Sequence, residues 1–320
     1  MTRTLRIGTR GSPLALVQAR AVSDRLNRIG VLSDIVVIRT SGDRLAEAPL
    51  SEVGGKRLFV KEIEDALLEG AIDLAVHSSK DMSVALPTGL RIAAVLPRED
   101  PRDAFVVAGS EPSSYEAVED LIIVLGQSPR VGTGSVRRVA QLKRLWPGAT
   151  FAPIRGNLDT RLRKLDAGEY DVLVLAVAGM KRLGREDRIS FALPYAACVP
   201  SPGQGVIAVE ARTADASLND AVAHINDPPT CSALIAERAL VAALGGGCQA
   251  PIGAIAVPVG DDLELHAVVV SLDGERAIRL HANGSMADAD TLGRRLAEQL
   301  IRQGALDILD ESRKTQAPIE

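Results

Sequence analysis

The stretch Asp73-Leu-Ala-Val-His-Ser-Ser-Lys-Asp81 decides the fold. Ile72 to Val76 is an apolar run rich in β-forming residues, and its length suits one buried strand. The run stops abruptly at five polar residues, His77 to Asp81. Ligands of α/β proteins bind at the carboxyl ends of buried strands, so we expect binding or chemistry here. For this stretch taken alone, a solvated turn is an equally good interpretation.

The residues upstream predict a parallel sheet. A strand over 4–9 is followed by Ser12 and Pro13, a pair typical of a helix start, and then by a second strand over 34–40. This order favours a βαβ unit. Arg10 and Ser12 lie between strand end and helix start, where anions often bind. The polar segment 41–57 predicts a binding loop that carries Lys56 beside two glycines.

A second α/β unit begins near Ala104, and its residues 130–164 carry nine basic side chains and a single acid. Arg137 and Arg138 fall in the first turn of a predicted helix, where a cation opposes the helix dipole. We therefore expect a bound anion beside them. Arg155 follows another predicted strand in the same way, and Arg161 lies on the helix after it. A solvated basic face is the alternative, and it suits Lys143, Arg144, Arg163 and Lys164 better.

Two Pro- and Gly-containing segments, 97–103 and 201–205, look like crossings between domains. We expect an α/β protein with two periplasmic-binding-protein-like lobes around a hinged cleft, followed by a small C-terminal α+β domain. The expected divisions are 1–98 with 204–225 for the first domain, 103–200 for the second and 228–320 for the third. In the third, strands over 252–259, 263–271 and 277–281 form an antiparallel sheet, and a final helix covers 291–302.

The composition excludes several classes. Aromatic residues are only 2% of the chain, which argues against stacking platforms for single-stranded nucleic acid. The net charge of −4 gives no general attraction to polyanions. No apolar run reaches the roughly 18–20 residues of a membrane span, and the first residues lack a signal core. We therefore expect a cytoplasmic protein that binds neither membrane nor nucleic acid.

Three cysteines lack the spacing of metal ligands, so no metal is expected. Cys198 and Cys231 are interpreted as small hydrophobic side chains. Cys248 differs because Gly245 to Gly247 precede it and leave the thiol without side-chain cover. These features allow two functions: an enzyme that uses Cys248 as covalent anchor or nucleophile, or a non-catalytic anion-binding or sensor protein. The glycines beside Cys248 favour the enzyme.

The chain resembles the porphobilinogen deaminase family, also called hydroxymethylbilane synthases. The motifs that carry the resemblance run in order through nearly the whole chain: RGSPLAL (10–16), VGGK (53–56), LFVKE (58–62), AVHSSKD (75–81), REDPRDAF (98–105), VGTGSVRR (131–138), RGN (155–157), LAVAG (175–179) and GGCQAPI (246–252).

The resemblance implies a transferase that condenses four porphobilinogen molecules, with loss of ammonia, into hydroxymethylbilane. It also implies a dipyrromethane cofactor, joined through a thioether to Cys248, on which the chain grows. Asp81 would stabilise the positive charge that forms when ammonia leaves. Arginines would bind the acetate and propionate groups of the substrate rings.

The expected site residues follow from these roles. Besides Cys248 and Asp81, the expected cofactor contacts are Ser78, Lys80, Thr133, Ser135, Arg137 and Arg138. The expected substrate contacts are Arg10, Ser12, Lys56, Arg155, Arg161, Arg182 and Gln204. The sequence departs from the usual family pattern at Glu52, often a lysine, at Arg57, commonly a glycine, and at Gly134, frequently a serine. The resemblance suggests a monomer, and a transient hand-off of product to uroporphyrinogen III synthase is the partner contact considered.

Overall fold

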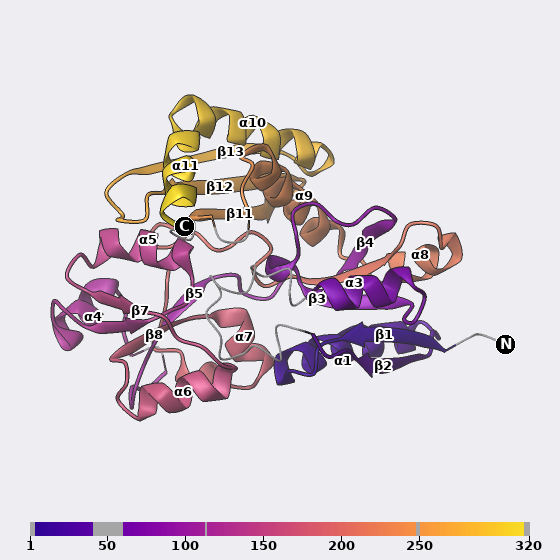
Figure 1. Cartoon of the computed structure of the whole chain (residues 1–320), viewed down its shortest axis with the longest axis horizontal. Coiled ribbons are helices and arrows are strands. Elements are labelled where there is room, and N and C mark those ends of the chain that lie inside the picture. Colours follow the sequence, from indigo (N-terminus) through magenta and orange to yellow (C-terminus); the bar gives the residue numbers. More distant parts are fainter. Residues whose placement is uncertain (1–3, 41–59, 113, 248–249, 317–320) are drawn as a thin grey trace.

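The computed structural model describes residues 4–40, 60–112, 114–247 and 250–316, which form three sheets with flanking helices (Figure 1). The predicted loop 41–57 and Cys248 lie outside the described residues. Figure 1 shows two α/β lobes side by side, with the C-terminal elements packed above both. Two lobes and a small α+β domain are therefore confirmed.

The first lobe holds a five-stranded sheet in the order β2-β1-β3-β10-β4. β1 pairs in parallel with β2 and β3, which confirms the predicted parallel unit. β10, reached only after the second lobe, pairs antiparallel with β3 and β4. The elements are β1 (Leu5–Thr9), α1 (Pro13–Arg28), β2 (Ser33–Val37), α3 (Lys61–Leu68), β3 (Leu74–Ser78), β4 (Leu90–Val95), β10 (Ile207–Arg212) and α8 (Ala216–Ala223).

The second lobe repeats this plan in the order β7-β6-β8-β5-β9. Again three parallel strands are followed by an antiparallel fourth, here β5. The elements are β5 (Asp103–Val107), α4 (Val118–Leu125), β6 (Arg130–Gly132), α5 (Val136–Leu145), β7 (Thr150–Ala152), α6 (Leu158–Asp166), β8 (Val172–Ala176), α7 (Val177–Arg182) and β9 (Phe191–Ala192). The first crossing, 97–103, thus leads into β5, and the second, 201–205, leads into β10; each of these strands is the fourth in the sheet of its lobe.

The C-terminal domain packs three helices against an antiparallel sheet. The elements are α9 (Pro228–Ala243), β11 (Ile252–Val259), β12 (Asp262–Val270), β13 (Ala277–Ser285), α10 (Ala289–Arg302) and α11 (Ala305–Gln316). The expectation that the helix over 291–302 is the final one was wrong. Gly304 adopts a left-handed φ of +94° that ends α10, and α11 then buries Ile308 and Leu309 in the same core.

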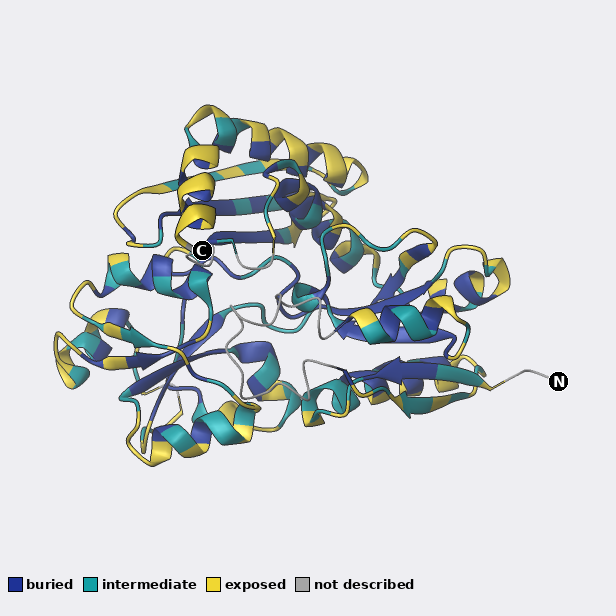
Figure 2. Ribbon diagram, in the orientation of Figure 1, coloured by how far each residue is buried: buried dark blue, intermediate teal, exposed yellow. Residues whose placement is uncertain are grey.

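Burial follows the sequence patterns. In Figure 2 the strands of the two lobes are mostly buried, whereas the outer faces of α10 and α11 are exposed. Leu74, Ala75 and Val76 of β3 are almost completely buried, as expected for the central apolar run. Cys198 is fully buried, which confirms its interpretation, but Cys231 is only partly buried. Within the described residues, no helix is apolar and long enough to cross a bilayer.

Candidate active site

Asp81 ends a single 3-10 turn, Ser79–Asp81, that follows β3 directly. The turn is anchored because the Ser79 N–H donates to the Val206 carbonyl at 2.9 Å, and the Met82 N–H donates back to Ser79 at 3.1 Å. Ser79 is buried, and Asp81 is half-buried. A carboxylate therefore lies at the carboxyl end of a central strand, as the sequence predicted.

Two predicted hydroxyl contacts already have protein partners. The Ser78 hydroxyl lies 2.8 Å from the side-chain nitrogen of Gln18 and 3.1 Å from its oxygen. The Ser12 hydroxyl accepts from the Ala15 N–H at 3.4 Å and caps α1. Both positions are at strand ends or helix starts of the first lobe, and the half-buried Arg10 lies beside Ser12.

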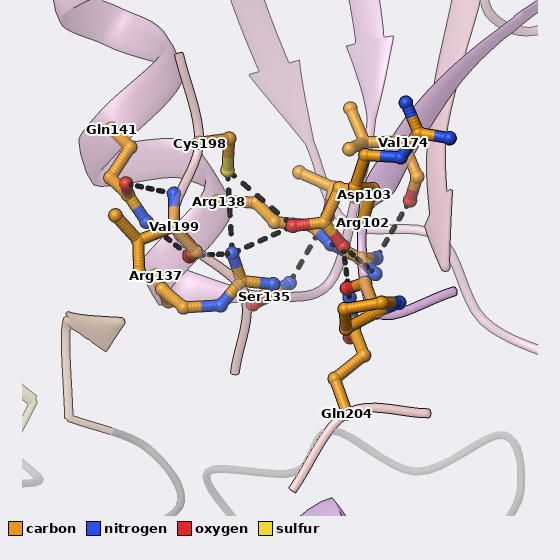
Figure 3. Close-up of polar contacts among 12 residues, drawn as sticks. Arg102, Asp103, Ser135, Arg137, Arg138, Gln141, Val174, Cys198, Val199 and Gln204 are labelled. Carbon is orange, nitrogen blue, oxygen red and sulfur yellow. Dashed lines mark hydrogen bonds and ion pairs between the residues drawn. The ribbon is translucent and has the colours of Figure 1, made fainter. Parts of the chain in front are cut away.

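Arg137 and Arg138 share one buried carboxylate, that of Asp103 (Figure 3). Arg137 Nη1 lies 2.7 Å from Asp103 Oδ2, and Arg138 Nη2 lies 2.7 Å from Oδ1. Arg137 also donates to the Val199 carbonyl, and Arg138 to the Val174 carbonyl. The expectation that a bound anion must balance these cations is revised, because the protein itself supplies Asp103.

Burial alone would raise the pKa of Asp103. The charges of Arg137 and Arg138, with hydrogen bonds from Arg137 and Gln204, outweigh that effect and hold the pKa well below its ordinary value. Sequence reasoning placed Asp103 in a crossing and gave it no role. The sequence did hold a signal for the role of Asp103: this acid begins the apolar segment that forms the fully buried strand β5. A buried carboxylate requires a cationic partner.

Arg137 keeps unused donors despite this pairing. Its Nε is buried and has no hydrogen-bond partner among the described residues. Thr133 is also buried and accepts from the Ser135 N–H at 3.3 Å, so the hydroxyl proton of Thr133 remains available. The start of α5 thus presents donors in excess of the acceptors around it. Gly134 is exposed there and could carry a serine, since an added Cβ would lie 3.5 Å from the Ile154 carbonyl.

Arg161 connects the two lobes electrostatically. Burial is the main cause that lowers the pKa of its guanidinium, and the nearby charges of Arg138 and Arg155 lower it further, whereas Asp81 of the first lobe raises it. Its Nε donates to the Gly156 carbonyl at 2.9 Å. No ion pair joins Arg161 to a carboxylate within the described ranges.

Arg182, at the end of α7, is in a similar state. Its Nη2 donates to the Gly205 carbonyl at 2.7 Å. Burial lowers the pKa of its guanidinium, and the charge of Glu99 opposes this only in part. α7 packs beside α1, the helix that Ser12 caps. Desolvated arginines with too little negative charge around them favour an anionic ligand.

Lys80 and Gln204 meet across the second crossing. Lys80 Nζ donates to Gln204 Oε1 at 3.2 Å, and Gln204 Nε2 donates to Asp103 Oδ1 at 2.8 Å and to the Pro101 carbonyl at 2.7 Å. Gln204 is 1% exposed. The predicted direct contact of Gln204 with substrate is therefore disfavoured, because its amide is already committed to protein partners.

The remaining predicted residues are Arg155, which is half-buried after β7, and Lys56 and Cys248, which lie outside the described residues. Cys198 contacts Asp103 and Arg137, and burial raises the pKa of its thiol to about 12. Among the described residues, no group of three or more His, Cys, Asp or Glu side chains is placed to hold a metal.

The charge of Asp81, at the end of β3 in the first lobe, acts on the desolvated guanidinium of Arg161 in the second lobe. Ionisable groups with shifted pKa values that face one another in this way are typical of functional sites, and the surplus of cations favours an anionic ligand. Comparison with known proteins agrees. The family model described as porphobilinogen deaminase, dipyromethane cofactor binding domain, matches residues 5–220, and the model of the porphobilinogen deaminase C-terminal domain matches residues 231–302.

A porphobilinogen deaminase of Syntrophobacter fumaroxidans (strain DSM 10017 / MPOB) is 44% identical over 311 residues, which cover 97% of this chain and 98% of the relative. The chain belongs to the porphobilinogen deaminase family.

Solved structures with partial likeness include an ancestral arginine-binding protein bound to arginine, at 15% identity and a TM-score of 0.37, covering 70% of this chain and 92% of that one. A Bordetella pertussis BvgS VFT2 domain is 15% identical with a TM-score of 0.41, covering 69% and 85%. Both scores are too low to support an argument about ligand or fold.

Proposed function

We propose that this protein is a hydroxymethylbilane synthase, a transferase that joins four porphobilinogen molecules head to tail with loss of one ammonia at each step. The observation that carries the proposal is the desolvated Arg161, whose guanidinium feels the charge of Asp81 from the other lobe but forms no ion pair with a carboxylate among the described residues. A substrate with an acetate and a propionate on each ring supplies that missing negative charge.

The described residues fit the dipyrromethane cofactor of the family. Its carboxylates need donors that the protein leaves unpaired, and the buried Nε of Arg137 is such a donor within the described chain. The further cofactor contacts in this proposal are Lys80 and Ser78 of the first lobe and Thr133, Ser135 and Arg138 of the second. In this proposal Cys248 carries the cofactor through a thioether. When bound, the cofactor is the primer to which each new pyrrole unit is added.

Asp81 has the central chemical role. Its carboxylate accepts a hydrogen bond from the pyrrole N–H of the incoming substrate and stabilises the positive charge that develops as ammonia leaves. Partial burial strengthens this interaction because less water competes for the carboxylate. Arg161 lies close enough for its charge to interact with that of Asp81, so it orients a substrate carboxylate beside the reacting ring. A final hydrolysis consumes one water and releases the four-ring product.

The substrate contacts in this proposal are carboxylate-binding side chains at the ends of strands and starts of helices: Arg10, Ser12, Lys56, Arg155, Arg161 and Arg182. The proposed domain divisions remain 1–98 with 204–225, 103–200 and 228–320, and the order of strands in each sheet supports them. A cytoplasmic monomer that hands its product transiently to uroporphyrinogen III synthase completes the proposal.

The intact mass of the purified protein tests the function. We expect an excess of two linked pyrrole units on the native protein and none on Cys248→Ser. If the native protein lacks the excess, porphobilinogen should be added and the mass measured again. Failure to form any adduct, with no ammonia released, would identify a two-lobed anion-binding protein instead.

A further inference from the structure

We propose that Gln204 is a positioning residue that holds the active-site turn of the first lobe and the arginine cluster of the second lobe in one relative arrangement. It acts through Lys80 on one side and through Asp103 on the other. The inference rests on the proposed function, because its effect is measured on the condensation reaction.

The orientation of the amide is set by the charges at its two ends. Its oxygen faces the ammonium of Lys80 at 3.2 Å, and its nitrogen faces the carboxylate of Asp103 at 2.8 Å. A neutral amide offers an acceptor to a cation and two donors, one of them to an anion, from one planar group. Both N–H bonds of Gln204 are used, since the second reaches the Pro101 carbonyl.

The backbone around Gln204 has almost no freedom to relax. Gly203 and Gly205 adopt left-handed φ values of +73° and +84°. A Cβ at Gly203 would lie 2.7 Å from Ser79 Oγ, and one at Gly205 would lie 2.2 Å from the Glu99 carbonyl oxygen. Arg98 Nε also donates to the Gln204 carbonyl at 2.9 Å. The amide is thus carried on a segment packed against the turn that leads to Asp81.

This arrangement gives Gln204 control over two groups of the site. An ammonium has three protons, and the one held by Gln204 fixes how the others point. Asp103 in turn accepts from Arg137 and Arg138. The continuous path Lys80–Gln204–Asp103 crosses from the turn after β3 to β5, so loss of the amide removes one hydrogen bond from each of these two charged groups.

Holoenzyme carrying Gln204→Leu should lose activity roughly tenfold to hundredfold in kcat, the scale of hydrogen bonds to charged groups, with a smaller change in KM. Asn219→Leu is the matched control. Asn219 is also a buried amide, bonded to the Arg212 carbonyl at 3.0 Å, but it lies on α8 away from the site. The Asn219→Leu variant should lose stability while its kcat changes little.

A double-mutant cycle separates positioning from general destabilisation. If Gln204 acts through Lys80, the fall in kcat caused by Gln204→Leu should be clearly smaller in the Lys80→Met background than in the wild type. Reductive methylation of Lys80, followed by peptide mass, should be faster in Gln204→Leu than in Asn219→Leu. Full additivity together with unchanged Lys80 reactivity would overturn the proposal.

A second variant, Gln204→Glu, and the intact mass of each protein complete the test. If Gln204→Leu does not fold, Gln204→Glu replaces it: a carboxylate keeps the acceptor for Lys80 but repels Asp103, so Lys80 reactivity should stay low while kcat falls. Unprotected Lys80 in this variant would count against the role of Gln204. The intact mass of the wild type and of each variant is recorded first. A wild type that forms no pyrrole adduct even after porphobilinogen is added means that the proposed function has failed rather than the positioning role.

Discussion

Asp103 receives two hydrogen bonds from Arg138 on a single oxygen, from Nε at 3.0 Å and Nη2 at 2.7 Å, although the two residues lie 35 positions apart. The contact joins the first residue of β5 to the first turn of α5. Because Asp103 is fully buried, its charge is stabilised almost entirely by the side chains that surround it.

Asp103→Asn should destabilise the protein by about 3 to 5 kcal/mol at pH 7, because two buried arginines lose their carboxylate. The pKa of Asp103 is lower in the folded state than its ordinary 3.8, so its contribution is present above that value and is lost as the pH falls through the folded pKa. The stability difference between wild type and variant should therefore shrink in strong acid. Urea unfolding across the pH range measures it.

Asp171→Asn is the matched control for this prediction. Asp171 pairs with Arg130 in the same lobe at 2.8 Å, but both side chains are solvent-accessible. Water screens such pairs, so Asp171→Asn should lower the free energy of unfolding much less than Asp103→Asn does. Equal losses for the two variants would contradict the buried-pair argument.

Glu237 should be a second point of high sensitivity. It is fully buried on α9 and accepts from Arg98 Nη1 at 2.5 Å, from the Gly203 N–H at 2.6 Å and from the Ala256 N–H at 2.9 Å. One carboxylate therefore binds both crossings and β11. Glu237→Ala should cost about 3 to 5 kcal/mol. Amide hydrogen exchange in this variant should be faster than in the wild type, above all in β11. Wild-type protection of the β11 amides would contradict the prediction.

Asp81→Asn should lower kcat by about a thousandfold or more while substrate affinity changes by less than about tenfold. The amide keeps the size of the side chain but removes the negative charge that stabilises the developing cation. Ammonia release in a single turnover, compared with the substrate dissociation constant, separates the two effects. An equal loss in binding would show that Asp81 holds the substrate rather than stabilising the cation.

Arg161→Met should raise KM for porphobilinogen by roughly tenfold to hundredfold, because a desolvated guanidinium binds a carboxylate more strongly than an exposed one does. Arg163 provides a control on the same helix: it is exposed and contacts Thr160 Oγ1 at 3.3 Å. Arg163→Met should leave KM nearly unchanged. Steady-state kinetics on both variants make the comparison, and similar KM values would remove Arg161 from the substrate contacts.

Local patterns in the sequence predicted most of the elements and the position of Asp81. β3 could be identified because an apolar run that ends at His77 has few other structures available to it. Ser12 and Pro13 marked the start of α1 correctly, because helix capping depends on neighbouring residues only. The helix α11 was missed because its apolar positions have meaning only against the core already formed by α9, α10 and the sheet.

What the sequence by itself determined was therefore the local structure, the family and the chemical types gathered at strand ends. Tertiary structure alone decided which charges meet. Asp103 neutralises Arg137 and Arg138, and Gln204 reaches Lys80, because two crossings bring together residues as much as 124 positions apart. Such pairings depend on distance and burial in the folded chain, and those same quantities set the pKa of Arg161 and the strength of each ion pair.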